Sequence, residues 1–193
     1  MAGFKYNLPP KEEKEERYDV STGLRRRGSY ILDVTGLPVG SYVPSFTPIA
    51  ADLVAKTAKI VVNVLVKENV AASATKVKID KGSYVVMGTI LGNGTKGATV
   101  TAIDKSKADY DELTLDAAMG ALKTGDVLFE AKVADGKEPK NVANSALYET
   151  HKVIEGINNV ALLQRAFEIE PEKLVTPFSA KDKANLPHFQ FNE

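Results

Sequence analysis

Three aspartates that stand close together in the sequence AIDKSKADYDEL have the chemistry of a metal site. Asp104, Asp109 and Asp111 offer carboxylate oxygens, the ligands that Ca²⁺ prefers. The segment lacks the central glycine and the final glutamate that an EF-hand loop requires. Two such acids also suit glycoside hydrolysis, but the chain has no tryptophan to line a sugar cleft. We therefore interpret the segment as a solvated turn before a strand, and we predict no metal, no cofactor and no enzymatic activity.

The remaining reactive side chains are few. The chain has no cysteine and only two histidines, His151 and His188, and neither histidine neighbours a serine in a GxSxG motif. We expect both histidines to pack or to form hydrogen bonds. The stretch Asn93–Gly97 resembles a phosphate-binding loop, but it lacks the GxxxxGK[ST] spacing and precedes a strand-like segment. A hairpin turn is the better interpretation.

One basic run has the chemistry of a docking site. Arg25, Arg26 and Arg27 are consecutive, and guanidinium groups bind carboxylates and phosphates through paired hydrogen bonds. The chain as a whole has 25 basic and 25 acidic residues, so its net charge gives no attraction to nucleic acid or to an anionic membrane. An acidic protein surface is the partner that we predict, and a merely solvated basic run remains the alternative.

The elements that would position these residues are short strands. Between 76 and 131, apolar residues alternate at Val77 and Ile79 and recur in runs bounded by glycine, asparagine or aspartate. Asn93-Gly94 is suited to a two-residue hairpin turn, and Gly125-Asp126 to a turn before the next strand. This pattern predicts a compact β domain.

Two further segments are candidates for contact with a partner. The sequence IVVNVLV, residues 60–66, predicts one strand that is buried on both faces or lies at a subunit contact, where Val62 and Val64 would meet a second copy. Before it, prolines alternate with large apolar residues on an extended chain that must lie against a core or a neighbour. The candidate contacts there are Tyr42, Pro44, Phe46 and Pro48.

The predicted fold is mainly β, with a small and partly barrel-like domain. We divide the chain into an extended N-terminal arm at 1–39, a β-rich core at 40–136, and a C-terminal extension at 137–193 that contains short helical turns. Ser179 is a candidate helix cap. The first twenty residues lack the apolar core of a secretory signal, and we expect no segment to span a membrane.

These segments, taken in order, resemble head-decoration and head-fibre proteins of tailed bacteriophages. The resemblance rests on YVPSFTPIAADL, IVVNVLV, KGSYVVMGTIL, VTAIDKSKADYDELTL and ALKTGDVLFEA, roughly residues 40–131. This part is similar to lambda-type decoration proteins. The ending QRAFEIEPEKLVTPFSAKDKANLPHFQFNE is similar to head-fibre proteins of phages and prophages of Bacteroides-like bacteria.

The resemblance implies a structural protein, made in the bacterial cytoplasm and located on the outer surface of the virion capsid. It further implies a homotrimer that binds the major capsid protein at local threefold positions. An alternative is a carbohydrate- or cell-surface-binding module displayed on the particle, with a host glycan as its partner. That alternative requires an exposed aromatic platform, for which Tyr84, Tyr110 and Tyr148 are the candidates.

Overall fold

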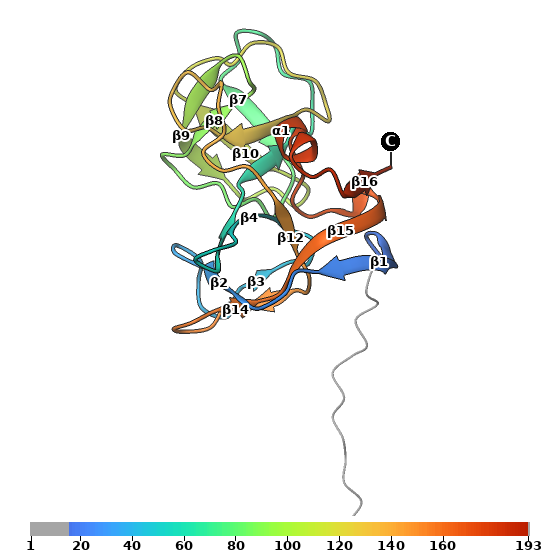
Figure 1. Cartoon of the computed structure of the whole chain (residues 1–193). Coiled ribbons are helices and arrows are strands. Elements are labelled where there is room, and N and C mark those ends of the chain that lie inside the picture. Colours follow the sequence, from blue (N-terminus) through green and yellow to red (C-terminus); the bar gives the residue numbers. More distant parts are fainter. Residues whose placement is uncertain (1–15, 193) are drawn as a thin grey trace, which may run out of the picture.

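The computed structural model describes residues 16–192 and confirms the prediction of a mainly β protein (Figure 1). Its strands form two lobes, which we call the barrel and the sheet lobe. The barrel strands are β6 (Asn63–Leu65), β7 (Lys76–Ile79), β8 (Ile90–Gly92), β9 (Gly97–Asp104), β10 (Asp111–Leu115) and β11 (Val127–Glu130). The sheet lobe contains β1 (Asp19–Arg25), β2 (Tyr30–Asp33), β3 (Tyr42–Val43), β4 (Pro48–Asp52), β5 (Thr57–Ile60), β12 (Ser145–Leu147), β13 (His151–Lys152), β14 (Asn159–Val160), β15 (Leu162–Ile169) and β16 (Phe189–Phe191).

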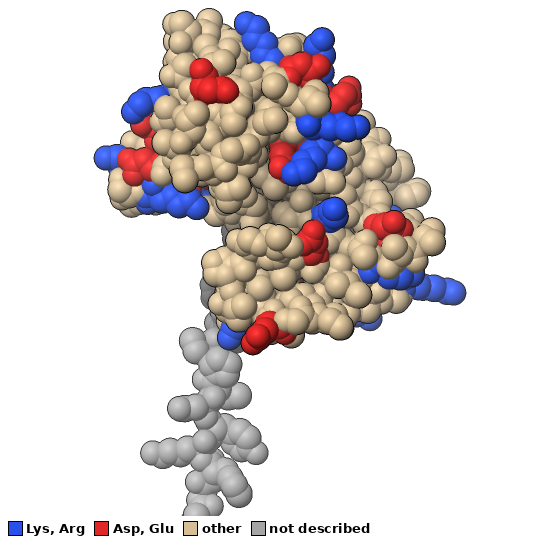
Figure 2. Space-filling model, turned by 90° about the vertical axis from the view of Figure 1, so that its left-hand side faces the viewer, with Lys and Arg blue, Asp and Glu red and all other residues tan. Residues whose placement is uncertain are grey.

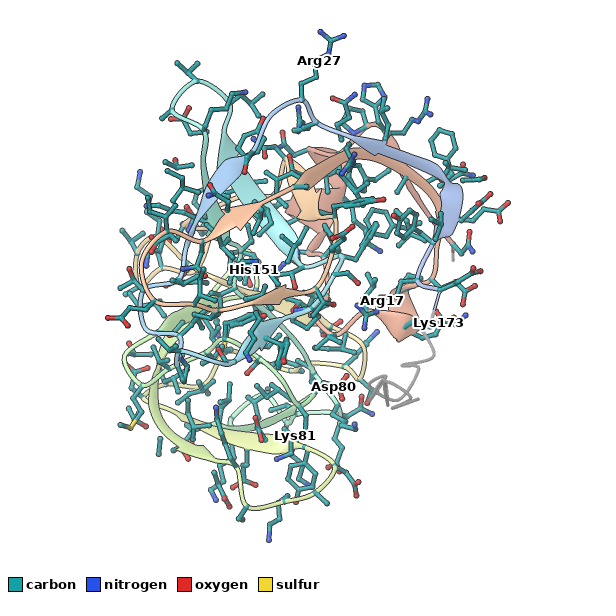
Figure 3. The ribbon with its side chains drawn as sticks, turned by 90° about the horizontal axis from the view of Figure 1, so that it is seen from below. Arg17, Arg27, Asp80, Lys81, His151 and Lys173 are labelled. Carbon is teal, nitrogen blue, oxygen red and sulfur yellow. The ribbon has the colours of Figure 1, made fainter. Side chains whose placement is uncertain are left out.

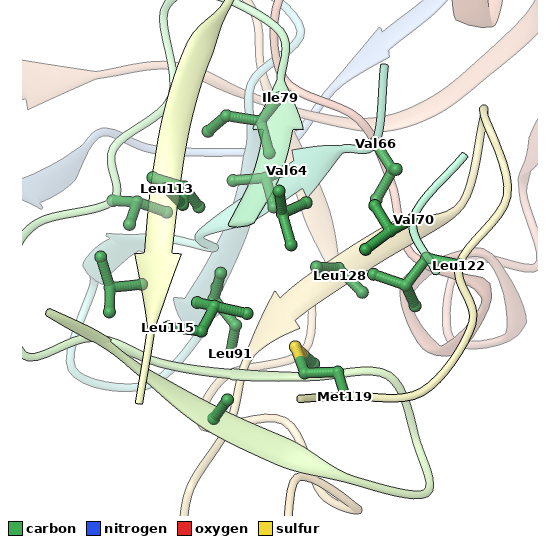
Figure 4. Close-up of a cluster of buried hydrophobic side chains, with 14 residues drawn as sticks. Val64, Val66, Val70, Ile79, Leu91, Leu113, Leu115, Met119, Leu122 and Leu128 are labelled. Carbon is green, nitrogen blue, oxygen red and sulfur yellow. The ribbon is translucent and has the colours of Figure 1, made fainter. Parts of the chain in front are cut away.

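The barrel is one six-stranded sheet that curls until its two edges meet. Its strand order is β6-β11-β8-β9-β10-β7. An antiparallel bridge between Val66 and Ile79 joins the two edges, and the amide of Lys67 donates to the carbonyl oxygen of Lys78 at 2.9 Å. Alternate side chains of every strand point inward and fill the interior with valine, leucine, isoleucine and one methionine (Figure 4). The predicted barrel-like character is thereby confirmed.

The turns of the barrel follow from its glycines. The β8–β9 hairpin forms as predicted, but its loop has four residues, Asn93 to Lys96, instead of two. The side-chain oxygen of Asn93 accepts hydrogen bonds from the amides of Thr95 and Lys96, which stabilises the longer loop. At the other predicted turn, Gly125 has a φ of 92° immediately before β11.

The sheet lobe contains strands from both ends of the described chain. Its main sheet has the order β1-β15-β12-β4-β5-β2-β14, and β16 pairs with β15. The small β3–β13 sheet lies over one part of it, and Val43, Val153 and Leu32 meet in the core between them. Most neighbours in the main sheet are antiparallel, whereas β2–β5 and β15–β16 are parallel.

Aromatic side chains pack the rest of the sheet lobe. Phe46 is buried at the centre, with its ring centroid 5.0 Å from that of Tyr18, 5.8 Å from Phe178 and 6.0 Å from Phe189. Its φ is 64°, a backbone conformation that costs a large residue on the order of 1–3 kcal/mol and persists only where packing fixes it. The aromatic contacts, including that of the C-terminal Phe189, supply that packing.

One buried carboxylate joins the two lobes. Asp182 lies in the short helix α1 (Ala180–Ala184), near the boundary of the barrel and the sheet lobe (Figure 1). It accepts hydrogen bonds from the side-chain amide of Asn63 at 2.8 Å and from the backbone amide of Ala143 at 2.7 Å. It also accepts from Ser179, whose predicted role as the helix cap is confirmed. Asn63 begins the first barrel strand, and Ala143 lies in the sheet-lobe core after the chain has returned from the barrel, so Asp182 holds both connecting segments.

Two sequence-based predictions about strands were wrong. Residues 60–66 are not one strand: β5 ends at Ile60 in the sheet lobe and β6 begins at Asn63 in the barrel. The segment is largely buried as predicted, because it crosses between two cores. One of the apolar runs between 76 and 131, at Val85 and Met87, does not form a strand either. Val85 precedes a turn and Met87 lies in it, and the turn is closed by the hydrogen bond from the amide of Thr89 to the carbonyl oxygen of Val86.

The predicted arm also differs from what the structure shows. Residues 1–15 of that arm lie outside the described residues. Residues 19–33 contribute β1 and β2 to the main sheet, so they are held by this chain and not only by a partner. The short helical turns predicted for the C-terminal part are present as a 3₁₀ helix, η1 (Pro171–Lys173), and as α1. The division into three domains stays a prediction.

None of the helices between residues 16 and 192 is long and apolar enough to cross a lipid bilayer.

Candidate interaction surface

Three of the six predicted contact residues outside the arginine run are buried. Phe46 and Val64 are each about 1% exposed, and Val64 belongs to the barrel core. Pro48 is buried, while Pro44 and Val62 are half-buried. Tyr42 is exposed on β3, with the Lys152 ammonium 5.9 Å from the centre of its ring. Of this extended segment, only Tyr42 presents a large apolar side chain to a partner.

The three arginines separate. Arg26 points into the fold, where its guanidinium donates to the hydroxyl of Ser145 at 2.7 Å and to the carbonyl oxygen of Asn144 at 2.8 Å. Arg25 stacks on the ring of Tyr148, 5.0 Å from the centroid. Arg27 extends away from the body of the protein (Figure 3). The run is therefore not a single basic clamp, because only Arg25 and Arg27 are exposed.

The aspartate cluster does not converge on a metal site. Asp111 is buried and pairs with the Lys81 ammonium at 2.7 Å. Asp104 is exposed and accepts from the amide of Ser106, and hydrogen bonding to this serine lowers the pKa of the carboxyl group. Within residues 16–192, no group of three or more histidines, aspartates or glutamates is arranged to hold a metal ion. The segment DELTL is strand β10, as predicted.

The three candidate platform tyrosines are all partly buried. Tyr84 extends from the barrel chain into the core of the sheet lobe, and burial raises the pKa of its phenol although a hydrogen bond with Thr47 opposes the shift. The Lys78 ammonium covers the ring of Tyr110 at 4.8 Å, and Arg25 covers Tyr148. These rings stabilise the fold, and they do not offer an open stacking face.

Pockets are small. One between the β8–β9 loop and β11 has a volume of about 230 Å³, and another between the barrel and residues 171–178 has about 210 Å³. Sites for small molecules are commonly 300–1,000 Å³. Neither of these two pockets reaches that range.

Two hydrogen-bonded turns of the sheet lobe and the adjacent strand β3 carry exposed apolar side chains. We call this group the turn-tip patch and define it as Val39, Tyr42, Ile154 and Ile157, which are 69%, 62%, 50% and 64% exposed. The turns that carry it are bonded to each other: the amide of Gly40 donates to the carbonyl oxygen of Val153, and the amide of Val153 donates to that of Ser41, each at 2.8 Å. Residues far apart in the sequence thus form one surface.

The first turn, Pro38 to Ser41, is fixed by its own hydrogen bonds. The amide and the hydroxyl of Ser41 both donate to the carbonyl oxygen of Pro38, at 3.1 and 2.6 Å. Gly40 has a φ of 88°, which a residue with a side chain rarely adopts. Val39 is held at the tip of this turn.

The second turn, residues 154–157, is fixed by a buried asparagine. The side chain of Asn158 accepts from the amide of Ile154 and donates to the carbonyl oxygens of Ile154 and Gly156, all at 2.9–3.0 Å. Its oxygen lies 2.9 Å from Nε2 of His151, which acts as the donor because the asparagine nitrogen already donates elsewhere. The hydrogen-bonding role predicted for His151 is confirmed. Both isoleucines are exposed on a turn that is already ordered.

Charged residues of both signs border the patch. Lys152 lies opposite Tyr42 in the β3–β13 pair, and Glu155 stands between the two isoleucines. Figure 2 shows that the face of the sheet lobe turned toward the viewer is largely uncharged, with isolated acidic and basic side chains at its margins. Beside the patch itself, Lys152 and Glu155 supply one charge of each sign.

Sequence reasoning identified only Tyr42 of this patch. Val39, Ile154 and Ile157 are residue types that normally mark a core, and nothing in their spacing indicates exposure. A usable signal was the neighbouring glycine: Val39-Gly40 and Glu155-Gly156 are turn-forming pairs, and large apolar residues beside such pairs lie at turn tips.

Comparison with known families gives one match. Residues 2–192 match the family described as phage head fiber protein. No curated protein and no solved structure shows significant similarity to the chain. The match covers nearly the whole chain, including both lobes.

Proposed function

Since the chain belongs to the phage head fiber protein family, we propose that this structural protein of the virion attaches to the outer surface of the capsid as a head-fibre or decoration component. The match over residues 2–192 is the observation that carries the proposal. The family is a structural one, and we propose no enzymatic activity for the chain. We also propose that the chain is related to lambda-type decoration proteins and to the head-fibre proteins of phages of Bacteroides-like bacteria.

The construction of the molecule supports a structural role. The barrel and the sheet lobe are joined at Asp182 and again where Tyr84 enters the sheet-lobe core. Two separate contacts limit the movement of one lobe against the other. A protein that is attached to a capsid shell through one lobe must hold its other lobe in place. The two contacts between the lobes suit this requirement.

We further propose that the chain acts as a homotrimer bound to the major capsid protein. A capsid presents one site many times, so three copies at a threefold axis bind together, and linked binding raises affinity by roughly 10²–10⁴ without a strong single contact. The balanced net charge of the chain suits this arrangement, because neighbouring copies do not repel one another.

Co-sedimentation with purified capsids tests the proposal. The full chain is mixed with capsids that lack it, and the pelleted fraction is measured against chain concentration. We expect saturable binding with a fixed number of copies per capsid, and binding that persists at high salt because net charge is not its source. Absence of the chain from the pellet at every concentration would contradict capsid attachment.

A further inference from the structure

We propose that the turn-tip patch is the surface through which copies of this chain associate with one another. The inference rests on the proposed homotrimer and adds which residues make its contacts. Large apolar side chains lie exposed at 50–69% in a cluster, and such clusters on soluble proteins mark contact surfaces.

Order in the free protein is the first argument. Hydrogen bonds within the chain already fix both turns that carry the patch. Association then costs little loss of backbone freedom, so the contact energy of the four side chains appears as affinity. Tyrosine and isoleucine at the centre of a surface with a polar rim correspond to the composition of protein–protein interfaces.

Charge is the argument for a second copy as the partner. Lys152 in β13 and Glu155 in the second turn lie beside the patch residues, and they are one residue of each sign. A partner of one dominant charge would leave one of them facing a like charge. Another copy of the same surface brings both signs, so each charge on one copy has an opposite charge available on the next.

A second exposed apolar turn provides the matched control. Val86 and Met87 lie at the tip of a barrel turn and are 62% and 70% exposed, close to the values of the two isoleucines. This turn belongs to the other lobe. Replacement of its two residues removes a similar apolar area without touching the patch.

The experiment measures molar mass by light scattering during gel filtration, over a series of protein concentrations. The wild-type chain is compared with the double variant Ile154→Ser/Ile157→Ser and with the control Val86→Ser/Met87→Ser. We expect the wild type and the control to form the same oligomer. For the patch variant we expect the dissociation constant to rise about a hundredfold or more, as for central apolar residues of an interface. Circular dichroism verifies that each variant is folded.

A second set of variants tests the charged residues and leaves the apolar side chains of the patch intact. Lys152→Glu and Glu155→Lys each place like charges on facing surfaces, so each alone weakens the oligomer by about tenfold. The double variant Lys152→Glu/Glu155→Lys restores association, because every copy again brings both signs and opposite charges face each other at each interface of the trimer. Failure of this double variant to recover would show that these charges do not face one another and would overturn the pairing argument.

The outcomes separate this inference from the proposed function. If the patch variant keeps the wild-type mass, or if the wild type is monomeric at every concentration, the patch is not a self-association surface. A patch variant that then loses capsid binding would assign the patch to the capsid, and the proposed function would survive. An oligomer that depends on the patch but never pellets with capsids would leave the inference standing and remove capsid attachment.

Discussion

The barrel and the sheet lobe differ in how the chain builds them and in what they present to the solvent. The barrel uses one uninterrupted stretch, residues 63–130, whereas the main sheet draws its strands from both sides of that stretch. Four ion pairs cover the barrel surface, and they join Lys67 to Asp80, Lys76 to Glu112, Lys78 to Glu68 and Lys81 to Asp111. The sheet lobe instead exposes the turn-tip patch.

This difference shows that two β lobes of one chain can have different tasks. A surface of paired charges remains solvated and discourages association, whereas an ordered apolar surface favours it. The barrel also exposes Val86 and Met87, but we propose that the sheet lobe is the lobe that makes the contact.

The barrel core should not tolerate a charge at Val64. Val64→Asp places a carboxylate among apolar side chains with 1% exposure, which we expect to cost more than about 4 kcal/mol of unfolding free energy. Thermal unfolding followed by circular dichroism measures the loss, and Val86→Asp at an exposed position should change stability by less than about 0.5 kcal/mol. A Val64→Asp protein that stays stable but no longer oligomerises would restore the sequence-based prediction of a subunit contact.

The connection between the lobes should fail when Asp182 is removed. Asp182→Ala leaves the amide of Ala143 without its acceptor and leaves the Asn63 side chain with only the carbonyl oxygen of Pro177 as acceptor, and we expect a loss of about 3 kcal/mol. Urea unfolding with probes in each lobe measures both stability and coupling. Two separate transitions in the variant would show that this carboxylate makes the lobes unfold together, whereas Asp109→Ala, at an exposed position, provides the control.

Acid should weaken both lobes together. Hydrogen bonds lower the pKa of Asp33, chiefly through Thr35, and of Asp52, through the amides of Ala55 and Val54, in the sheet lobe. In the barrel, hydrogen bonds from Ser106 and Thr99 lower the pKa of Asp104 and Asp116. A carboxyl group with a lower pKa in the folded state adds stability above its unfolded pKa, and this stability disappears as the pH falls through the folded value.

The loss should therefore begin below about pH 4. We expect the double variants Asp33→Asn/Asp52→Asn and Asp104→Asn/Asp116→Asn each to reduce the dependence of the unfolding free energy on pH between 6 and 2.5. Acid titrations followed by fluorescence or circular dichroism measure the slopes. An unchanged slope in one of the two variants would assign acid sensitivity to the other lobe alone.

Local features were predictable from the sequence, and distant pairings were not. Turn dipeptides such as Gly125-Asp126 and the cap at Ser179 depend on a few neighbouring residues, and both formed as predicted. The pairing of β2 with β5 depends on residues about 26 positions apart, and that of β1 with β15 on residues from opposite ends of the described chain. No local pattern specifies such partners.

The candidate surface was hard to predict for a related reason. Val62 and Val64 have the β-branched composition of a strand at an edge or in a core, and only the crossing between two sheets decides that Val64 is buried. Ile154 and Ile157 have the composition of core residues, and only the asparagine-fixed turn decides that they are exposed. Exposure is a property of the assembled fold, and composition reports it poorly.

The way in which the chain enters and leaves the barrel has a consequence for protein engineering. Asn63 and Ala143 bind the same carboxylate, so the two strands of chain that connect the barrel to the sheet lobe begin side by side. Any folded module whose own ends lie close together fits between those points without stretching the lobe beneath it. A foreign domain in place of the barrel would thus be attached to the sheet lobe at two neighbouring points. If the chain binds particles as proposed, each bound copy would display that domain.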